Sequence, residues 1–206
     1  MLSGKRLLLG MLGIVGAAFV FLVITFATRP PDPKLADLGL VPAFSLTDDR
    51  GQTFTQEAMR GRVTVVGFIF TRCDTICPTT TATMARIQEK TQDVGDRIKL
   101  VSFSMDPTFD SPQVLAAYAE KFHADAERWR FLTGPLETIR ALAEHTFMFG
   151  MPRAADKPGG VPNIVHRGLF FLVDGSLHVR GFYDYQDIPA LEELIRDARF
   201  LARTTT

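Results

Sequence analysis

The sequence predicts an α/β domain in which helices cover both faces of a mixed β-sheet. Two runs, at residues 63–70 and 98–105, are almost wholly apolar and rich in β-branched residues, as expected of strands buried on both faces. Helical stretches alternate with such strands. Near the C-terminus, Asp174-Gly175 joins two more strands, which is a strong hairpin signal. A chain of 206 residues fits one such domain plus an appendage.

The first expected element of the domain is a hairpin over residues 43–54, around the turn residues 48–51. A helix beginning at Ser111 is expected because Ser111 suits an N-cap and Pro112 suits the first helical position. Residues 149–163 are expected to be a loop because they are rich in proline and glycine. The other expected elements are strands at 63–70, 98–105, 129–132, 168–173 and 177–182, and helices at 78–93, 111–122, 135–145 and 188–202.

Composition excludes several functional classes. The formal net charge is zero, and no basic cluster alternates with aromatic residues, so nucleic-acid binding is not expected. The chain has only two cysteines, which excludes a disulfide-rich scaffold and a zinc site of four cysteines. The hydrophobic content of 46% is enough for a full core.

The first thirty residues differ from the rest. Residues 7–28 carry no charge, and this run is about the length of a helix that crosses a bilayer. A cleaved signal peptide usually has an apolar stretch of only about 7–15 residues, so an uncleaved transmembrane anchor is expected. The predicted organisation is a short cytoplasmic N-terminus (1–6), the anchor (7–28), a proline-rich linker (29–37) and the folded domain (38–203).

The expected orientation puts the domain outside the membrane. Lys5 and Arg6 favour a cytoplasmic N-terminus, although Arg29 and Lys34 partly offset them. A thiol pair also suits an oxidising exterior. The expected location is therefore the bacterial inner membrane with a periplasmic domain, or the mitochondrial inner membrane facing the intermembrane space in a eukaryote.

The two cysteines, Cys73 and Cys77, lie between a predicted strand and a predicted helix. A helix N-terminus carries partial positive charge and is expected to lower a thiol pKa. A spacing of four residues puts both sulfurs on one face of a helical turn. The pair could form a redox-active disulfide, hold a metal ion, or serve only as buried apolar side chains. With thiols at the first strand-to-helix junction, the element order is that of a thioredoxin-like fold with an extra N-terminal hairpin.

A copper ion held by two thiols needs a third ligand, and imidazole is the usual one. His166 is the best candidate because it directly precedes the strand at 168–173, and in a thioredoxin-like fold the loop entering that strand faces the thiol pair. His123 and His145 are expected at helix ends and His178 in the hairpin. Met148 and Met151 could offer thioethers to Cu(I), but methionine more often fills a core, and neither is assigned as a ligand. Asp106 could orient a group near the site or simply end a strand before Pro107, and it is not assigned as a ligand either.

The ordered motifs of the chain resemble the Sco/SenC family, from about residue 38 to residue 202. The resemblance rests on these segments: residues 71–73 and 77–78, 104–107 with 110–112, 131–134, and His166 ahead of 170–174. It implies a membrane-anchored, thioredoxin-like protein that binds copper, as Cu(I) or Cu(II), through Cys73, Cys77 and His166. It also implies a role as a copper chaperone, with subunit II of cytochrome c oxidase as the client for its dinuclear copper centre.

Three residues depart from the family pattern. Asp74 stands where proline is frequent, and Val165 and Arg167 flank His166 where Asp and Ser or Thr are frequent. The expected protein delivers copper and is not a turnover enzyme, with an upstream copper donor or thiol reductant as a further partner. The alternative is a thiol–disulfide oxidoreductase that keeps the client's cysteines reduced. A thiol peroxidase ranks last because Asp74 occupies the position where that reaction needs threonine.

Overall fold

The computed structural model describes residues 14–21, 23, 33–73, 76–148, 153–157, 161–164 and 168–204. The chain divides into two compact units, Met1–Pro33 and Lys34–Thr206. Residues 14–21 and 23 of the first unit are helical. Within the described ranges, no helix has both the length and the apolar character needed to cross a membrane. The predicted anchor over residues 7–28 lies largely outside these ranges.

The second unit is built on a seven-stranded sheet with the order β2-β1-β5-β4-β3-β8-β9. Its three central strands β3, β4 and β5 are parallel, whereas β1, β2, β8 and β9 run antiparallel to their neighbours. The sheet is therefore mixed, as predicted. The strands are β1 (Ser45–Asp48), β2 (Thr53–Thr55), β3 (Val63–Ile69), β4 (Ile98–Ser104), β5 (Trp129–Thr133), β8 (Leu169–Val173) and β9 (Val179–Asp184).

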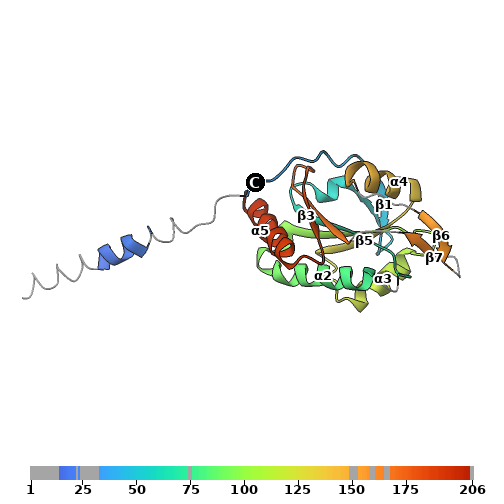
Figure 1. The fold of residues 1–206 in the computed structure, drawn as a ribbon, viewed down its shortest axis with the longest axis horizontal. Helices are drawn as coiled ribbons and strands as arrows, with labels where there is room; N and C mark the ends of the chain where they lie inside the picture. Colours follow the sequence, from blue (N-terminus) through green and yellow to red (C-terminus); the bar gives the residue numbers. More distant parts are fainter. Residues whose placement is uncertain are drawn as a thin grey trace, which may run out of the picture. The chain divides into compact units, whose positions relative to one another are not determined.

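Helices cover both faces of this sheet, as predicted (Figure 1). The helices α2, α3 and α5 lie on one face, and α4 continues into a π-helix on the other. Short 3₁₀ helices complete the connections. The helices are α2 (Ile76–Lys90), α3 (Pro112–Lys121), α4 (Leu136–Ala141), α5 (Ile188–Thr204), the 3₁₀ helices η1 (Gln56–Met59) and η2 (Gln92–Arg97), and the π-helix η3 (Leu142–Thr146).

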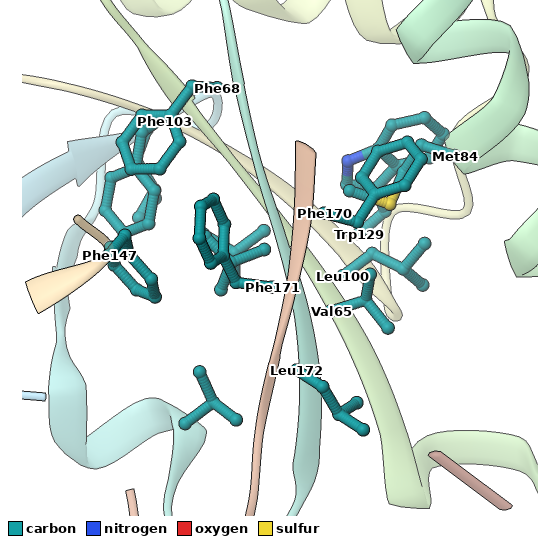
Figure 2. Packing of buried hydrophobic residues seen from close by; sticks show 14 of the residues in the cluster. Val65, Phe68, Met84, Leu100, Phe103, Trp129, Phe147, Phe170, Phe171 and Leu172 are labelled. Atoms are coloured by element: carbon teal, nitrogen blue, oxygen red, sulfur yellow. The ribbon is translucent and has the colours of Figure 1, made fainter. Parts of the chain in front are cut away.

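The core has one aromatic layer and one mixed layer, separated by the central strands (Figure 2). Side chains alternate along β3, so Phe68 points to the face covered by η3. There it packs against Phe103, Phe147 and Phe171, with ring centroids 5.4 to 6.1 Å apart. On the opposite face Gly67 allows α2 to approach closely, because a Cβ at Gly67 would lie 3.1 Å from the Met84 methyl group. The two layers fix α2 against the C-terminal half of β3.

Most of the predicted elements are confirmed with small shifts. The Ser111 hydroxyl accepts the Val114 N–H at 3.3 Å, and Pro112 begins α3 as expected. The predicted helix at 78–93 begins two residues earlier and gives way to η2 after Lys90. Leu177 turns the β8–β9 hairpin with φ of 70°, and β9 starts two residues later than predicted.

The prediction of a loop over residues 149–163 is wrong in part. This region contains a small two-stranded antiparallel sheet, formed by β6 (Arg153–Lys157) and β7 (Val161–Ile164). Neither segment has the alternating apolar pattern that signals a strand. Pairing between the two segments stabilises them as strands, and composition alone does not reveal that pairing.

Candidate thiol and metal centre

The two cysteines lie at the edge of the sheet where the parallel strands end. Cys73 follows β3 by four residues, and its N–H donates to the Phe70 carbonyl at 3.2 Å in a tight turn. Cys77 lies in the first turn of α2. In open α/β sheets this carboxyl edge is where ligands and reactive groups gather. The predicted strand–thiol–helix arrangement is therefore confirmed.

The two sulfurs face each other but differ in environment. Both residues are in the thiol form and buried, with Cys73 9% exposed and Cys77 1% exposed. The backbone N–H of Cys77 donates to the Cys73 sulfur, with an N–S distance of 3.4 Å. This N–H belongs to the first turn of α2, where the helix dipole favours negative charge. Cys73 is thus the more exposed residue of the pair, and its sulfur is the one that accepts a backbone N–H of α2.

The expectation that the helix would lower the pKa of both thiols is wrong for Cys77. A hydrogen bond with the Cys73 sulfur raises the pKa of Cys77 well above its ordinary value, and burial raises it further. Both effects disfavour a negative charge on the Cys77 sulfur. At neutral pH without a metal ion, Cys77 therefore keeps its proton.

A hydroxyl pair supports α2 just beyond Cys77. The Thr81 hydroxyl donates to the Cys77 carbonyl at 2.8 Å and contacts the Tyr118 hydroxyl of α3 at 3.0 Å. Burial raises the pKa of Tyr118, and the negative charge of the thiol pair adds to that shift. This contact ties the first turn of α2 to α3. Sequence patterns did not single out Thr81 or Tyr118.

Two carboxylates from the loop after β4 hold the residues just before Cys73. Asp106 binds the Arg72 guanidinium, with an Nε–Oδ2 distance of 2.9 Å. Asp110 accepts the Thr71 N–H at 3.2 Å. The sequence had suggested two roles for Asp106, ending a strand or orienting a group near the site, and the structure shows that it orients Arg72. Thr71 and Asp110 were noticed only as parts of a motif, because the contact spans 39 residues of chain.

His166 lies outside the described residues, as do its neighbours Val165 and Arg167 and also Asp74 and Met151. The described residues on either side of it are Ile164, which ends β7, and Gly168, which directly precedes β8. In the antiparallel pairing of β8 with β3, Phe171 lies opposite Val66. Carrying that register on by three residues brings Gly168 level with Ile69, the last residue of β3. Among the described residues, no three side chains of the ligand-forming types His, Cys, Asp and Glu are grouped to hold a metal ion.

The other histidines have different surroundings. His123 and His145 are exposed at helix ends, as predicted. The Nδ1 atom of His178 lies 2.9 Å from the Asp37 carboxylate, which joins the β8–β9 turn to the segment entering the domain. This contact lowers the pKa of Asp37.

Met148 does not fill the core as its residue type suggested. Its side chain is 73% exposed, and its φ of 48° is unusual for a residue other than glycine. It follows Phe147, whose buried ring makes the packing contact that had been expected of the methionine. Exposure by itself does not make Met148 a ligand.

A thiol pair at the start of a helix, after the first central strand of a mixed sheet, defines a thioredoxin-like protein with a dithiol or soft-metal site. Comparison with known proteins identifies the particular family. The SCO1/SenC family pattern matches residues 34–202, so this chain belongs to the SCO1/SenC family. The resemblance read from the sequence motifs is thereby confirmed.

Three relatives illustrate the match. A Stutzerimonas stutzeri protein, named for an inferred copper-binding role, is 33% identical over 68% of this chain and 69% of its own. A SCO1/SenC family lipoprotein from Bacillus anthracis is 32% identical, with a TM-score of 0.72, over 84% of this chain and 99% of its own. BsSco, a member of the Sco family of cytochrome c oxidase assembly proteins with an identified disulfide switch, is 28% identical, with a TM-score of 0.71, over 84% of this chain and 98% of its own.

Copper binding is found among Sco homologues, and copper-bound Sco structures are among the further neighbours of this fold. The family contains cytochrome c oxidase assembly proteins. It includes both a lipoprotein and a mitochondrial protein. The predictions of copper binding and of a role in cytochrome c oxidase assembly are thus confirmed at the level of the family.

Proposed function

We propose that this protein is a copper chaperone that holds one copper ion through Cys73, Cys77 and His166. The observation that carries the proposal is the Cys73–Cys77 arrangement. Two buried cysteines meet at the N-terminus of α2, where the backbone N–H of Cys77 donates to the Cys73 sulfur. Soft thiolate ligands suit Cu(I), and an added imidazole also suits Cu(II).

Support for His166 as the third ligand comes from the topology around it. Gly168 directly precedes β8, whose N-terminal end lies beside the C-terminal end of β3 in their antiparallel pairing. The cysteines follow that same end of β3. Gly168 therefore lies at the edge of the sheet at which Cys73 lies, and His166 precedes Gly168 by two residues. A site of two thiolates and one imidazole keeps a position open, so a copper ion can pass to another protein's ligands.

The proposed client is subunit II of cytochrome c oxidase, at its dinuclear copper centre. The support is that BsSco, at 28% identity, belongs to a family of cytochrome c oxidase assembly proteins. An upstream copper donor or a thiol reductant completes the proposed set of partners. Delivery is a transfer between proteins, so we propose a carrier and not a turnover enzyme.

A second candidate function is a thiol–disulfide oxidoreductase that reduces the client's copper-ligand cysteines. The observation that favours it is the difference between the two thiols, since Cys73 is the more exposed and Cys77 stays protonated. A thiolate formed at Cys73, beside the thiol of Cys77, suits attack followed by resolution. BsSco is also described as having a disulfide switch. This function needs both cysteines and does not need His166.

We also propose that residues 7–28 anchor the protein as a single membrane-spanning helix, with residues 29–37 as a linker and residues 38–203 on the outer side. The uncharged length of the segment supports this proposal. The proposed location is the bacterial inner membrane with a periplasmic domain, or the mitochondrial inner membrane facing the intermembrane space.

A copper titration of the reduced domain separates the two functions. Residues 34–206 form a compact unit, so wild type and His166→Ala can be compared in that form. We expect the wild type to bind one copper per chain. We expect His166→Ala to bind copper more weakly, with a larger loss of affinity for Cu(II) than for Cu(I). The dithiol of His166→Ala should still oxidise. If His166→Ala binds Cu(I) and Cu(II) as tightly as the wild type, the three-ligand assignment fails. In a separate cellular test, full oxidase assembly in cells that carry His166→Ala would favour the oxidoreductase function.

A further inference from the structure

The loop after β4 makes a set of contacts that neither copper binding nor thiol exchange accounts for. Asp110 is completely buried, yet it is a carboxylate. It accepts hydrogen bonds from the Thr71 N–H, the Thr71 hydroxyl and the Ser104 hydroxyl. Ser104 ends β4, and Asp110 directly precedes the N-cap of α3. One carboxylate therefore joins the turn after β3 to the end of β4 and the start of α3.

Asp106 makes a parallel set of contacts with the next residue of that turn. Its Oδ2 atom lies 2.9 Å from Nε of Arg72 and 2.6 Å from Nη2, and it is only 3% exposed. Two hydroxyl groups hold Asp106 in place. The Thr108 hydroxyl donates to Oδ1 of Asp106, and the Ser104 hydroxyl accepts the backbone N–H of Asp106. The Arg72 guanidinium also lies over the Phe109 ring, 4.4 Å from its centroid.

These contacts define a carboxylate clamp, in which Asp106 and Asp110 hold Arg72 and Thr71. The clamped residues directly precede Cys73, whose sulfur accepts the N–H of Cys77 on the other side. Cys73 is thus held through its preceding backbone and through its sulfur. Since a shift of under 1 Å would break a 3.4 Å contact, the position of residues 71–72 decides whether that N–H reaches the sulfur.

The cost of the clamp indicates that it does more than join two loops. Burying a carboxylate is expensive unless several donors compensate it, and burial raises the pKa of Asp110 while the Ser104 and Thr71 hydrogen bonds lower it.

We propose that Asp106 and Asp110 are positioning residues, which place the Cys73 sulfur at the N–H of Cys77 and so set its reactivity toward disulfides and copper. This proposal deepens the proposed function, because it assigns the groups that fix one of the two sulfurs. It is independent of His166. It also applies whether the site delivers copper or reduces disulfides.

The test compares Thr71→Val with Thr71→Ser. The valine removes only the hydroxyl that reaches Asp110 and keeps the side-chain shape, whereas the serine keeps the hydroxyl. Asp110→Asn removes the charge at constant size. Tyr183→Phe is the control for stability, because it deletes a buried 2.8 Å hydrogen bond to Asp197 between β9 and α5 and leaves the clamp intact.

The first readout needs no copper. An aromatic disulfide reagent is added to the reduced domain, residues 34–206. The Cys73 thiolate attacks the reagent, forming a mixed disulfide and releasing one aromatic thiolate. Cys77 then displaces the second aromatic thiolate, loses its proton to solvent and closes the intramolecular disulfide. The rate of the first release reports Cys73, and the melting temperature of each variant is measured beside it. The second readout is copper affinity by competition with a chelator.

We expect Thr71→Val and Asp110→Asn to change the first rate constant and to weaken copper binding by roughly 10- to 100-fold, the usual effect of removing a group that orients a metal ligand. Thr71→Ser should behave as the wild type, and Tyr183→Phe should lower the melting temperature without changing the rate. If Thr71→Val and Asp110→Asn keep the wild-type rate and lose only melting temperature, the clamp is structural and the proposal is overturned. If Asp110→Asn fails to fold, Thr71→Val decides. A wild type that binds no copper defeats the proposed function, while the rate comparison still tests the clamp.

Discussion

At the scale of single residues, the two cysteines have different chemistry although they are four positions apart. Cys73 accepts a backbone N–H from the start of α2 and is the more exposed, whereas Cys77 is buried and retains its proton. The sequence motif identified the pair but gave both sulfurs the same environment. The difference arises from the turn that follows β3, which places Cys73 ahead of the helix and Cys77 inside it.

The first residue-scale prediction concerns the metal. Cys73→Ser and Cys77→Ser should each abolish tight copper binding, because each removes a soft, charged ligand and leaves a weakly binding hydroxyl. Copper per chain, measured after gel filtration of the reduced domain, should fall from one to near zero. Thr79→Ser is a suitable control, since Thr79 lies in α2 and is exposed. Full copper stoichiometry in either cysteine variant would contradict the ligand assignment.

The second residue-scale prediction concerns thiol reactivity. At pH 7 without metal, iodoacetamide should modify Cys73 before Cys77, because alkylation needs an accessible thiolate. In Cys73→Ser, the hydrogen bond that chiefly raises the pKa of Cys77 is lost, so Cys77 should begin to react at a lower pH than in the wild type. Peptide mass mapping across a pH series measures both effects. Initial modification of Cys77, or an unchanged pH profile in Cys73→Ser, would contradict the assigned charge distribution.

At the scale of elements, the site is assembled by three strand ends. The parallel strands β3 and β4 deliver the Cys73 turn and the Asp106–Asp110 loop to one edge of the sheet. The antiparallel strand β8 starts at that same edge and brings the chain from residue 168 onward. The thiols, the clamp and the start of β8 therefore lie at one edge of the sheet because of its topology, although they are spread over about half of the chain.

Gly168 gives an element-scale prediction. A Cβ at this position would lie 2.1 Å from Cδ1 of Tyr185, and the Tyr185 N–H donates to the Gly168 carbonyl at 2.9 Å. Gly168→Ala should therefore lower the free energy of unfolding by about 1–3 kcal/mol, the usual cost of overpacking. Urea unfolding measures this loss.

A double-variant comparison supplies the control for Gly168. In a Tyr185→Ala background the ring is absent, so the added methyl group should cost much less than in the wild type. The difference between the two costs is the coupling between the residues. An equal cost in both backgrounds would show that the Tyr185 ring does not limit this position, and that the start of β8 disfavours a side chain for another reason.

At the scale of the whole molecule, the sequence predicted what depends on local patterns. The buried strands, the Ser111 cap and the Asp174-Gly175 hairpin each follow from residues close in the chain. The contact of Asp110 with Thr71 was missed because it joins residues 39 apart, and no spacing rule links them. The β6–β7 pair was missed because its strands lack alternating apolar and polar residues. The exposure of Met148 was missed because the neighbouring Phe147 supplies the buried side chain that was expected of the methionine.

The last prediction concerns how the chain is held in the cell. Residues 7–28 should remain attached and keep the domain at the outer face of the membrane, since the uncharged run is long enough to span the hydrocarbon core. Anchoring would raise the effective concentration of the domain near a membrane-bound client without adding a contact. Protease added to intact spheroplasts should digest the domain, whereas the same protease should spare it in inverted membrane vesicles. Protection in spheroplasts would reverse the orientation and separate the domain from the proposed client. A mature N-terminus near Arg29 would instead indicate a cleaved signal and a diffusing carrier.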